Sequence, residues 1–283
     1  MTGPVPDPVP ARLVTALAGF AARPAVLVAV DFDGTLAPLV ADPATSRPLP
    51  AARDALHALA AVDGVRVALV SGRTLADLRR LGDPPPAAAL VGSHGAELEL
   101  PAAAGAPSGL VEPAELPGQA RLVLAEVVDQ VQAIGAAHPG TSVEVKPSAA
   151  VLHTRGADRA IAAAATAQAL AGPAALAGVH AMHGKEVVEF AVTDAGKGTA
   201  LLRLRGLLGL PAAGGVLYMG DDVTDERAFA VLDDDAGDVT VKVGDGPTAA
   251  RHRVPTPEAV AGVLGALLTE LTEASRAPRP PSA

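Results

Sequence analysis

Two patterns of hydrophobic and polar residues divide this chain. In its first and last parts, short continuous apolar runs alternate with stretches of helical length and pattern. Such runs indicate strands buried on both faces, and their alternation with helices is typical of a parallel sheet covered by helices. The expected strands are 25–30, 65–70, a third beginning at 90–91, 216–219 and 239–243, and the expected helices include 49–61 and about 74–81.

The middle of the chain follows a different pattern. Residues 141–155 alternate polar and apolar side chains, which predicts half-exposed antiparallel strands. Segments 101–109 and 193–198 are rich in turn-forming residues and predict hinges. The proline-rich ends, 3–10 and 277–283, are expected to be extended or disordered. Between the hinges we expect helices at 118–137 and 157–170 and strands at 177–182 and 186–191.

Together these patterns predict the α/β class. We expect a Rossmann-like, doubly wound and mostly parallel sheet formed by residues 1–104 plus 191–283, with an α+β domain, 105–190, inserted into it. A doubly wound sheet binds its ligand at the carboxyl ends of its strands. Polar residues that directly follow the apolar runs are therefore the first candidates for chemistry.

Charge and composition narrow the range of partners. The net charge of −9 disfavours nucleic acid, because binding to a phosphate backbone needs a basic surface. The chain has no cysteine, which excludes thiolate zinc sites and cysteine nucleophiles. No basic segment precedes the N-terminal apolar stretch, and arginine and proline interrupt it before about 20 apolar residues. We expect a cytoplasmic protein with no membrane partner; its oligomeric state is not indicated.

The first chemical signal is the pair Asp31 and Asp33, directly after the first apolar run. Two close carboxylates repel each other and need a cation or a shared proton. The pair therefore predicts either a Mg²⁺ site or a nucleophile beside an acid and base. The alternative is a simple turn, since Asp-Gly is a common turn signal.

The second signal is Ser71-Gly72-Arg73, at the end of the second apolar run. A hydroxyl, a close backbone approach and a guanidinium fork suit phosphate oxygens. The alternative is an ordinary turn into a helix, with Thr74 as the N-cap.

Lys197 opens a later helix, where the helix dipole disfavours a cation, so its position hints at an anion. The alternative is a solvated lysine. Asp221, Asp222 and Asp225 follow the run at 216–219 and offer the hard oxygens that Mg²⁺ prefers. The alternative for this cluster is helix capping by Thr224 or Asp222. Capping explains two of the three carboxylates at most.

Taken in order, DFDGT (31–35), SGR (71–73), Lys197 and GDDVTD (220–225) resemble the motifs of the haloacid dehalogenase superfamily of phosphotransferases. The resemblance narrows to the trehalose-6-phosphate phosphatases and covers nearly everything from about residue 25 to 268. It is carried by VGSHGAE (91–97), VEVKPSAAVLHTR (143–155) and GKEVVEF (184–190).

This resemblance implies a Mg²⁺-dependent phosphatase that hydrolyses trehalose 6-phosphate through an aspartyl-phosphate. Asp31 would be the nucleophile and Asp33 the acid and base. The Asp31 carboxylate, the Asp33 backbone carbonyl and Asp221 would hold Mg²⁺. Asp222 and Asp225 would support that ion indirectly. The phosphate-binding residues would be Ser71, Gly72, Arg73 and Lys197.

By the same resemblance, the inserted domain would be a cap that selects the small-molecule substrate. Glu144, Lys146 and Glu189 would bind the glucose hydroxyls, with His94 on the core side. The chain departs from the family at Thr154, where a tyrosine is usual. It also departs at 191–192, where Ala-Val replaces a basic residue and proline.

Two other functions compete with this one. The chain could be a phosphatase for another sugar phosphate, which a panel of phosphorylated sugars would reveal. It could also be a catalytically silent sugar-phosphate sensor, although the intact Asp31, Asp33, Lys197 and Asp221 argue against that.

Overall fold

The computed structural model describes residues 9–101, 109–111, 116–193 and 196–276. The chain divides into two compact units, each described here by itself. The α/β unit comprises Met1–Val111 and Gly196–Ala283, and the α+β unit comprises Glu112–Ala195. Much of the proline-rich N-terminus, the C-terminal segment 277–283 and most of the first expected hinge lie outside the described residues, as do two residues of the second hinge.

The α/β unit is built on a sheet in the order β12-β11-β10-β1-β2-β3-β4-β5. Its strands are parallel from β12 to β3, and the last two strands of this order, β4 and β5, pair antiparallel. The strands are β1 (Val26–Asp31), β2 (Val65–Val70), β3 (Ala89–Gly92), β4 (Glu97–Leu100), β5 (Gly109–Val111), β10 (Gly215–Gly220), β11 (Val239–Val243) and β12 (His252–Val254).

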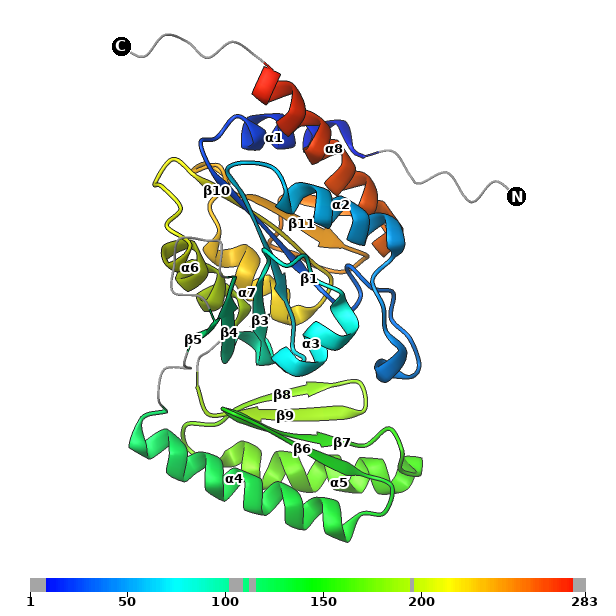
Figure 1. Ribbon diagram of the computed structural model, residues 1–283. Coiled ribbons are helices and arrows are strands. Elements are labelled where there is room, and N and C mark those ends of the chain that lie inside the picture. The colour runs from blue at the N-terminus through cyan, green and yellow to red at the C-terminus, as the bar shows by residue number, and fades with distance from the viewer. Residues whose placement is uncertain (1–8, 102–108, 112–115, 194–195, 277–283) are drawn as a thin grey trace, which may run out of the picture. The chain divides into compact units, whose positions relative to one another are not determined.

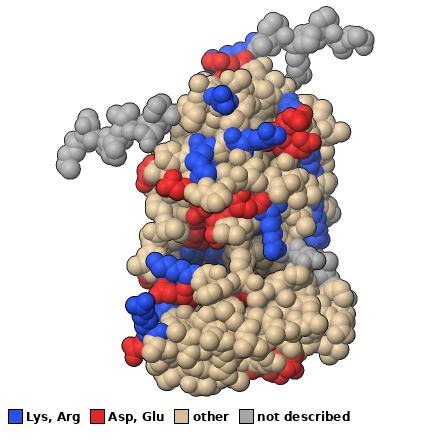
Figure 2. All heavy atoms as spheres, turned by 180° about the vertical axis from the view of Figure 1, so that it is seen from behind, with Lys and Arg blue, Asp and Glu red and all other residues tan. Residues whose placement is uncertain are grey.

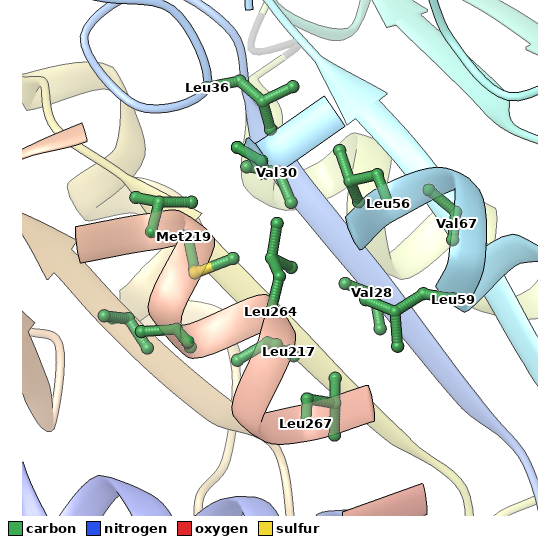
Figure 3. Packing of buried hydrophobic residues seen from close by; sticks show 14 of the residues in the cluster. Val28, Val30, Leu36, Leu56, Leu59, Val67, Leu217, Met219, Leu264 and Leu267 are labelled. Atoms are coloured by element: carbon green, nitrogen blue, oxygen red, sulfur yellow. The ribbon is translucent and has the colours of Figure 1, made fainter. Parts of the chain in front are cut away.

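Helices cover both faces of this sheet (Figure 1). Residues of β1 alternate between the two faces: Val28 and Val30 pack toward α2 and α8, as Figure 3 shows, whereas Leu27 and Ala29 pack with α6 and α7. The helices are α1 (Ala11–Ala21), α2 (Pro50–Ala60), α3 (Leu75–Gly82), α6 (Lys197–Leu207), α7 (Val223–Val231) and α8 (Pro257–Arg276). The predicted doubly wound, mostly parallel sheet is therefore confirmed.

The sequence order of the strands reverses beside β1. The chain runs from β1 to β2 and β3 on one side, and later adds β10, β11 and β12 on the other. The carboxyl ends of β1 and β10 therefore flank a topological switch point, where open α/β sheets bind their ligands.

The α+β unit has a wholly antiparallel sheet in the order β6-β7-β9-β8. Its helices pack on one face, where Ala150, Leu152, Val188 and Phe190 lie in a core of their own. The elements are α4 (Gly118–Ala137), β6 (Ser142–Lys146), β7 (Ala149–His153), α5 (Arg159–Ala171), β8 (His180–Gly184) and β9 (Val187–Ala191).

Within the described residues, no helix is long and apolar enough to cross a membrane. Figure 2 shows acidic and basic side chains intermingled on the face that it draws. Ion pairs such as Arg251–Asp234, whose Nε and Oδ2 lie 3.0 Å apart, hold opposite charges together.

Candidate active site

Asp31 and Lys197 form a buried ion pair at the end of β1. Lys197 Nζ lies 2.7 Å from Asp31 Oδ1 and 2.8 Å from Asp225 Oδ1. The lysine is the first residue of α6, while Asp225 lies in the first turn of α7. Two helices and the central strand thus bring these three charged groups together, although the chain separates them widely.

An acidic cluster surrounds this pair. Asp31, Asp221 and Asp225 each offer a carboxylate oxygen, and these oxygens all lie within 4.8 Å of one another. Gly34 leaves room for the cluster, because its φ is +79° and a Cβ there would lie 2.1 Å from Asp221 Oδ2. Thr35 Oγ1 donates to Asp221 Oδ1 at 3.4 Å. Three carboxylates with one lysine leave an excess of negative charge, and hard oxygens suit a divalent cation. These residues fit a metal ion.

Burial makes the cluster costly in its metal-free form. It raises the pKa of Asp31 well above the ordinary value, even though Lys197 opposes the shift. Burial and the neighbouring Asp225 raise the pKa of Asp221 to about 6. Burial lowers the pKa of Lys197, but Asp31 and Asp225 raise it by more, so the lysine stays charged. A cation in the cluster would stabilise the ionised carboxylates.

Tyr218 is a member of this network that the sequence did not reveal. It lies on β10, wholly buried, and its hydroxyl donates to Asp225 Oδ1 at 2.6 Å. Its ring also packs on Phe229, with 5.7 Å between the ring centroids. An apolar run gives no sign that one of its members carries a polar partner. The only available signal was its position two residues before Gly220.

Asp33 lies apart from the cluster and has its own cation. Strand β1 ends at Asp31, so the alternation of strand side chains does not extend to Asp33. Arg73 Nε lies 2.6 Å from Asp33 Oδ2, and Nη2 lies 2.7 Å from Oδ1. Ser46 Oγ donates to the same Oδ1 at 3.1 Å. Arg73, predicted to bind phosphate, thus holds the carboxylate of Asp33 here.

Ser71 and Gly72 form a tight turn at the end of β2. Ser71 is buried, and its Oγ accepts a hydrogen bond from Arg73 N at 3.1 Å. A Cβ on Gly72 would lie 2.4 Å from the His94 ring, so only glycine leaves space for that histidine. Residues Ser93, His94 and Gly95 all have positive φ, at 48°, 54° and 110°. This strained turn brings His94 onto the Ser71-Gly72 loop.

Asp222 has a local partner. It is exposed, it caps α7, and its carboxylate accepts a hydrogen bond from Val223 N at 2.7 Å. Asp225 completes the capping box by accepting from Asp222 N at 2.9 Å. Within this segment, Asp222 caps α7, Asp221 belongs to the acidic cluster, and Asp225 does both.

The three predicted sugar-binding residues share one face of the α+β sheet. Glu144 pairs with Val151 across β6 and β7, and Val151 pairs with Glu189 across β7 and β9. Lys146 Nζ lies 3.1 Å from Glu189 Oε2, in a largely buried pair. His153 Nε2 lies 3.0 Å from Glu144 Oε2, and this hydrogen bond lowers the pKa of Glu144. The helices pack on the opposite face of this sheet from these polar groups.

The fold is similar to that of haloacid dehalogenase-like hydrolases. The solved structure of a haloacid dehalogenase-like hydrolase from Bacteroides thetaiotaomicron matches with a TM-score of 0.58 at 15% identity, covering 85% of this chain and 98% of that one. The chain belongs to the trehalose-phosphatase family, whose model matches residues 29–257. The predicted fold class and the family resemblance are both confirmed.

Two relatives illustrate the match. The chain is 35% identical over 271 residues to a trehalose-phosphate phosphatase of Mycobacterium tuberculosis, covering 90% of this chain and 63% of that protein. It thus spans less than two thirds of that relative's length. The structure of the C. albicans trehalose-6-phosphate phosphatase C-terminal domain matches with a TM-score of 0.74 at 23% identity, covering 93% of this chain and 98% of that one.

Proposed function

We propose that this protein is a Mg²⁺-dependent phosphatase that hydrolyses trehalose 6-phosphate to trehalose and phosphate. One observation carries the proposal: in a member of the trehalose-phosphatase family, Asp31, Lys197 and Asp221 converge at the switch point of the sheet. A nucleophile, a cation for the phosphate and an acidic metal site are the parts that phosphoryl transfer needs. The reaction belongs to the formation of trehalose, and the expected location is the cytoplasm.

The metal site follows from the cluster. The Asp31 and Asp221 carboxylates and the Asp33 backbone carbonyl would hold Mg²⁺. Asp225 would support the ion by fixing Lys197, and Asp222 would support it by capping α7. When bound, the ion neutralises charge on the phosphoryl oxygens. The structure favours Mg²⁺ over softer metals because the donors are oxygens only.

The chain's own residues then carry two steps. Asp31 attacks phosphorus as the bond to the sugar oxygen breaks, and Asp33 gives that oxygen a proton. Asp33 next takes a proton from the water that attacks the aspartyl-phosphate, which releases phosphate and restores Asp31. Ser71, the Gly72 backbone and Lys197 bind the non-bridging phosphate oxygens.

The α+β unit supplies selectivity in this proposal. Glu144, Lys146 and Glu189 lie on the face of its sheet opposite the helices, and carboxylates and an ammonium together match the donors and acceptors of a sugar. We infer that this unit acts as a cap over the substrate and that His94 contributes from the α/β unit.

The test is phosphate release from trehalose 6-phosphate against a panel of other sugar phosphates, with and without Mg²⁺. Asp31→Asn should lower the rate by at least about 10³-fold while the circular dichroism spectrum persists. Asp54 is an exposed aspartate on α2, and the Asp54→Asn variant is the matched control. Near-normal turnover by Asp31→Asn would exclude Asp31 as the nucleophile. A preference for another sugar phosphate would exclude trehalose 6-phosphate as the main substrate. A wild-type protein without turnover would indicate a sensor.

A further inference from the structure

The guanidinium of Arg73 is fixed on several sides. Besides its two bonds to Asp33, its Nη1 donates to the backbone carbonyl of Pro43 at 2.9 Å. Its Cζ lies over the Phe32 ring, 5.4 Å from the centroid, in a cation–π contact. The side chain of Arg73 is only 16% exposed. The arginine therefore joins the turn after β2 to the segment after β1 and to the 43–46 turn.

Both oxygens of Asp33 are engaged by this arrangement. Nε meets Oδ2 at 2.6 Å and Nη2 meets Oδ1 at 2.7 Å, which is the bidentate fork that fixes a carboxylate in orientation as well as in place. Ser46, wholly buried, adds a bond to Oδ1 at 3.1 Å. By contrast, the carboxylate of Asp31 accepts a hydrogen bond from Lys197. The two aspartates of the DFDGT segment thus have separate cations.

We propose that Arg73 is a positioning residue for Asp33 and not a phosphate ligand. This inference rests on the proposed function, because it concerns the residue that exchanges protons with the sugar and with water. A guanidinium that bound phosphate would have to leave Asp33 without its fork. Lys197 and Ser71 already offer donors to the phosphate. Arg73 instead restrains the carboxylate so that little reorganisation is needed when substrate arrives.

The two roles predict different kinetics, which a set of variants separates. Arg73→Met removes the fork but keeps an apolar stem against Phe32. Arg73→Lys keeps the charge without the fork, and Ser46→Ala removes the third donor to Asp33. Arg80→Met is the matched control, since Arg80 lies on the exposed surface of α3 and pairs with Asp77. Thermal melting checks that each variant folds. If Arg73→Met does not fold, Arg73→Lys takes its place in the comparison.

The measurements are steady-state kinetics with trehalose 6-phosphate, the Ki of inorganic phosphate as a competitive inhibitor, and the burst of p-nitrophenol from p-nitrophenyl phosphate. For Arg73→Met we expect kcat to fall by about 10- to 100-fold, because general acid and base catalysis supplies about 10²–10⁴-fold. KM and the phosphate Ki should stay within about threefold, because the phosphate contacts are intact. The burst should persist, since p-nitrophenol leaves without an acid.

Arg73→Lys should recover only part of kcat, since a point charge does not reproduce the fork. In an Asp33→Asn background, Arg73→Met should add no further loss in the burst or in turnover. A tenfold or larger rise of KM and of the phosphate Ki, with kcat preserved, would overturn the proposal and make Arg73 a phosphate ligand. Unchanged kinetics in Arg73→Met and Arg73→Lys would overturn it as well.

A readout without substrate separates this inference from the proposed function. The Arg73 Nε–H resonance of the isotopically labelled protein should move in Asp33→Asn, because its acceptor changes. It should stay in place in Asp54→Asn. If wild type hydrolyses no phosphate ester, the proposed function fails, and this spectrum still decides whether the fork exists. A resonance that does not move in Asp33→Asn would exclude the fork between Arg73 and Asp33.

Discussion

Lys197 shows at the residue scale how tertiary contacts override a local preference. A cation in the first turn of a helix is disfavoured by about 0.3–1 kcal/mol. The ammonium is buried between Asp31 and Asp225, and removing one partner from a buried pair costs about 3–5 kcal/mol. The buried pairs are the larger effect, so the lysine stays at the start of α6.

The raised pKa of Asp221 leads to a pH dependence of metal binding. In the metal-free protein this group has a pKa of about 6, so it is largely protonated at pH 5 and ionised at pH 7.5. A divalent cation needs the ionised form and displaces the proton. We expect the Kd for Mg²⁺, measured by titration calorimetry, to rise by about tenfold per pH unit well below 6. Asp221→Asn should abolish most binding; equal affinity at pH 5 and pH 7.5 would contradict this expectation.

The same shift has a stability consequence of definite sign. The folded pKa of Asp221 lies above the ordinary value of 3.8, so the folded state binds the proton more tightly than the unfolded state. The resulting stabilisation is present below about pH 4 and is lost as the pH rises through about 6. Mg²⁺ should therefore raise the melting temperature at pH 7.5 more than at pH 5. An equal rise at both values would oppose the assignment.

At the scale of elements, α7 depends on its cap. Asp222 is its N-cap and Asp225 completes the box, so Asp222→Ala should cost about 1 kcal/mol. We expect a drop of about 2–4 °C in melting temperature with Mg²⁺ affinity changed less than about threefold. Asp222→Ser, which can still cap, should restore most of the loss. A tenfold weaker metal affinity without a change in melting temperature would show that Asp222 serves the ion.

Element lengths decide how much of the fold the sequence could predict. Strands β1, β2, β10 and β11 lie within one residue of their expected ends, because each is a run buried on both faces. The strands β4, β5 and β12, at the two ends of the sheet, are only three or four residues long and carry no such run. Helix α1 was not predicted, and β8 was misplaced by about three residues because it is exposed throughout.

The candidate site follows the same logic. Asp31 and Asp221 follow two neighbouring parallel strands, so their proximity could be expected from the sequence, since strand ends in one sheet meet at one edge. Lys197 reaches them from the start of α6. The sequence alone could not predict which side chains pair across long sequence distances. The fork from Arg73 to Asp33 and the bond from Tyr218 to Asp225 depend on rotamers and packing, which no motif encodes.

At the scale of the whole molecule, the proposed function assigns chemistry and selectivity to separate units. Glu144 belongs to the α+β unit, whereas Asp31 belongs to the α/β unit. We expect Glu144→Ala to raise KM for trehalose 6-phosphate by at least about tenfold, because a polar site loses a partner for the sugar hydroxyls. KM for p-nitrophenyl phosphate should stay within about twofold. Glu126→Ala, on the exposed surface of α4, is the control; equal effects on both substrates would refute the separation.

The hydrogen bond between Tyr218 and Asp225 suggests a fluorescence assay for the metal site. The chain has one tyrosine and no tryptophan, so emission excited near 280 nm comes from Tyr218 alone. That ring is wholly buried, and its hydroxyl donates a hydrogen bond to the Asp225 carboxylate. We expect this hydrogen bond to quench the tyrosine emission. A cation that draws Asp225 toward itself would weaken that bond and brighten the signal. We therefore expect tyrosine emission to report the occupancy of the metal site, without a label and without turnover.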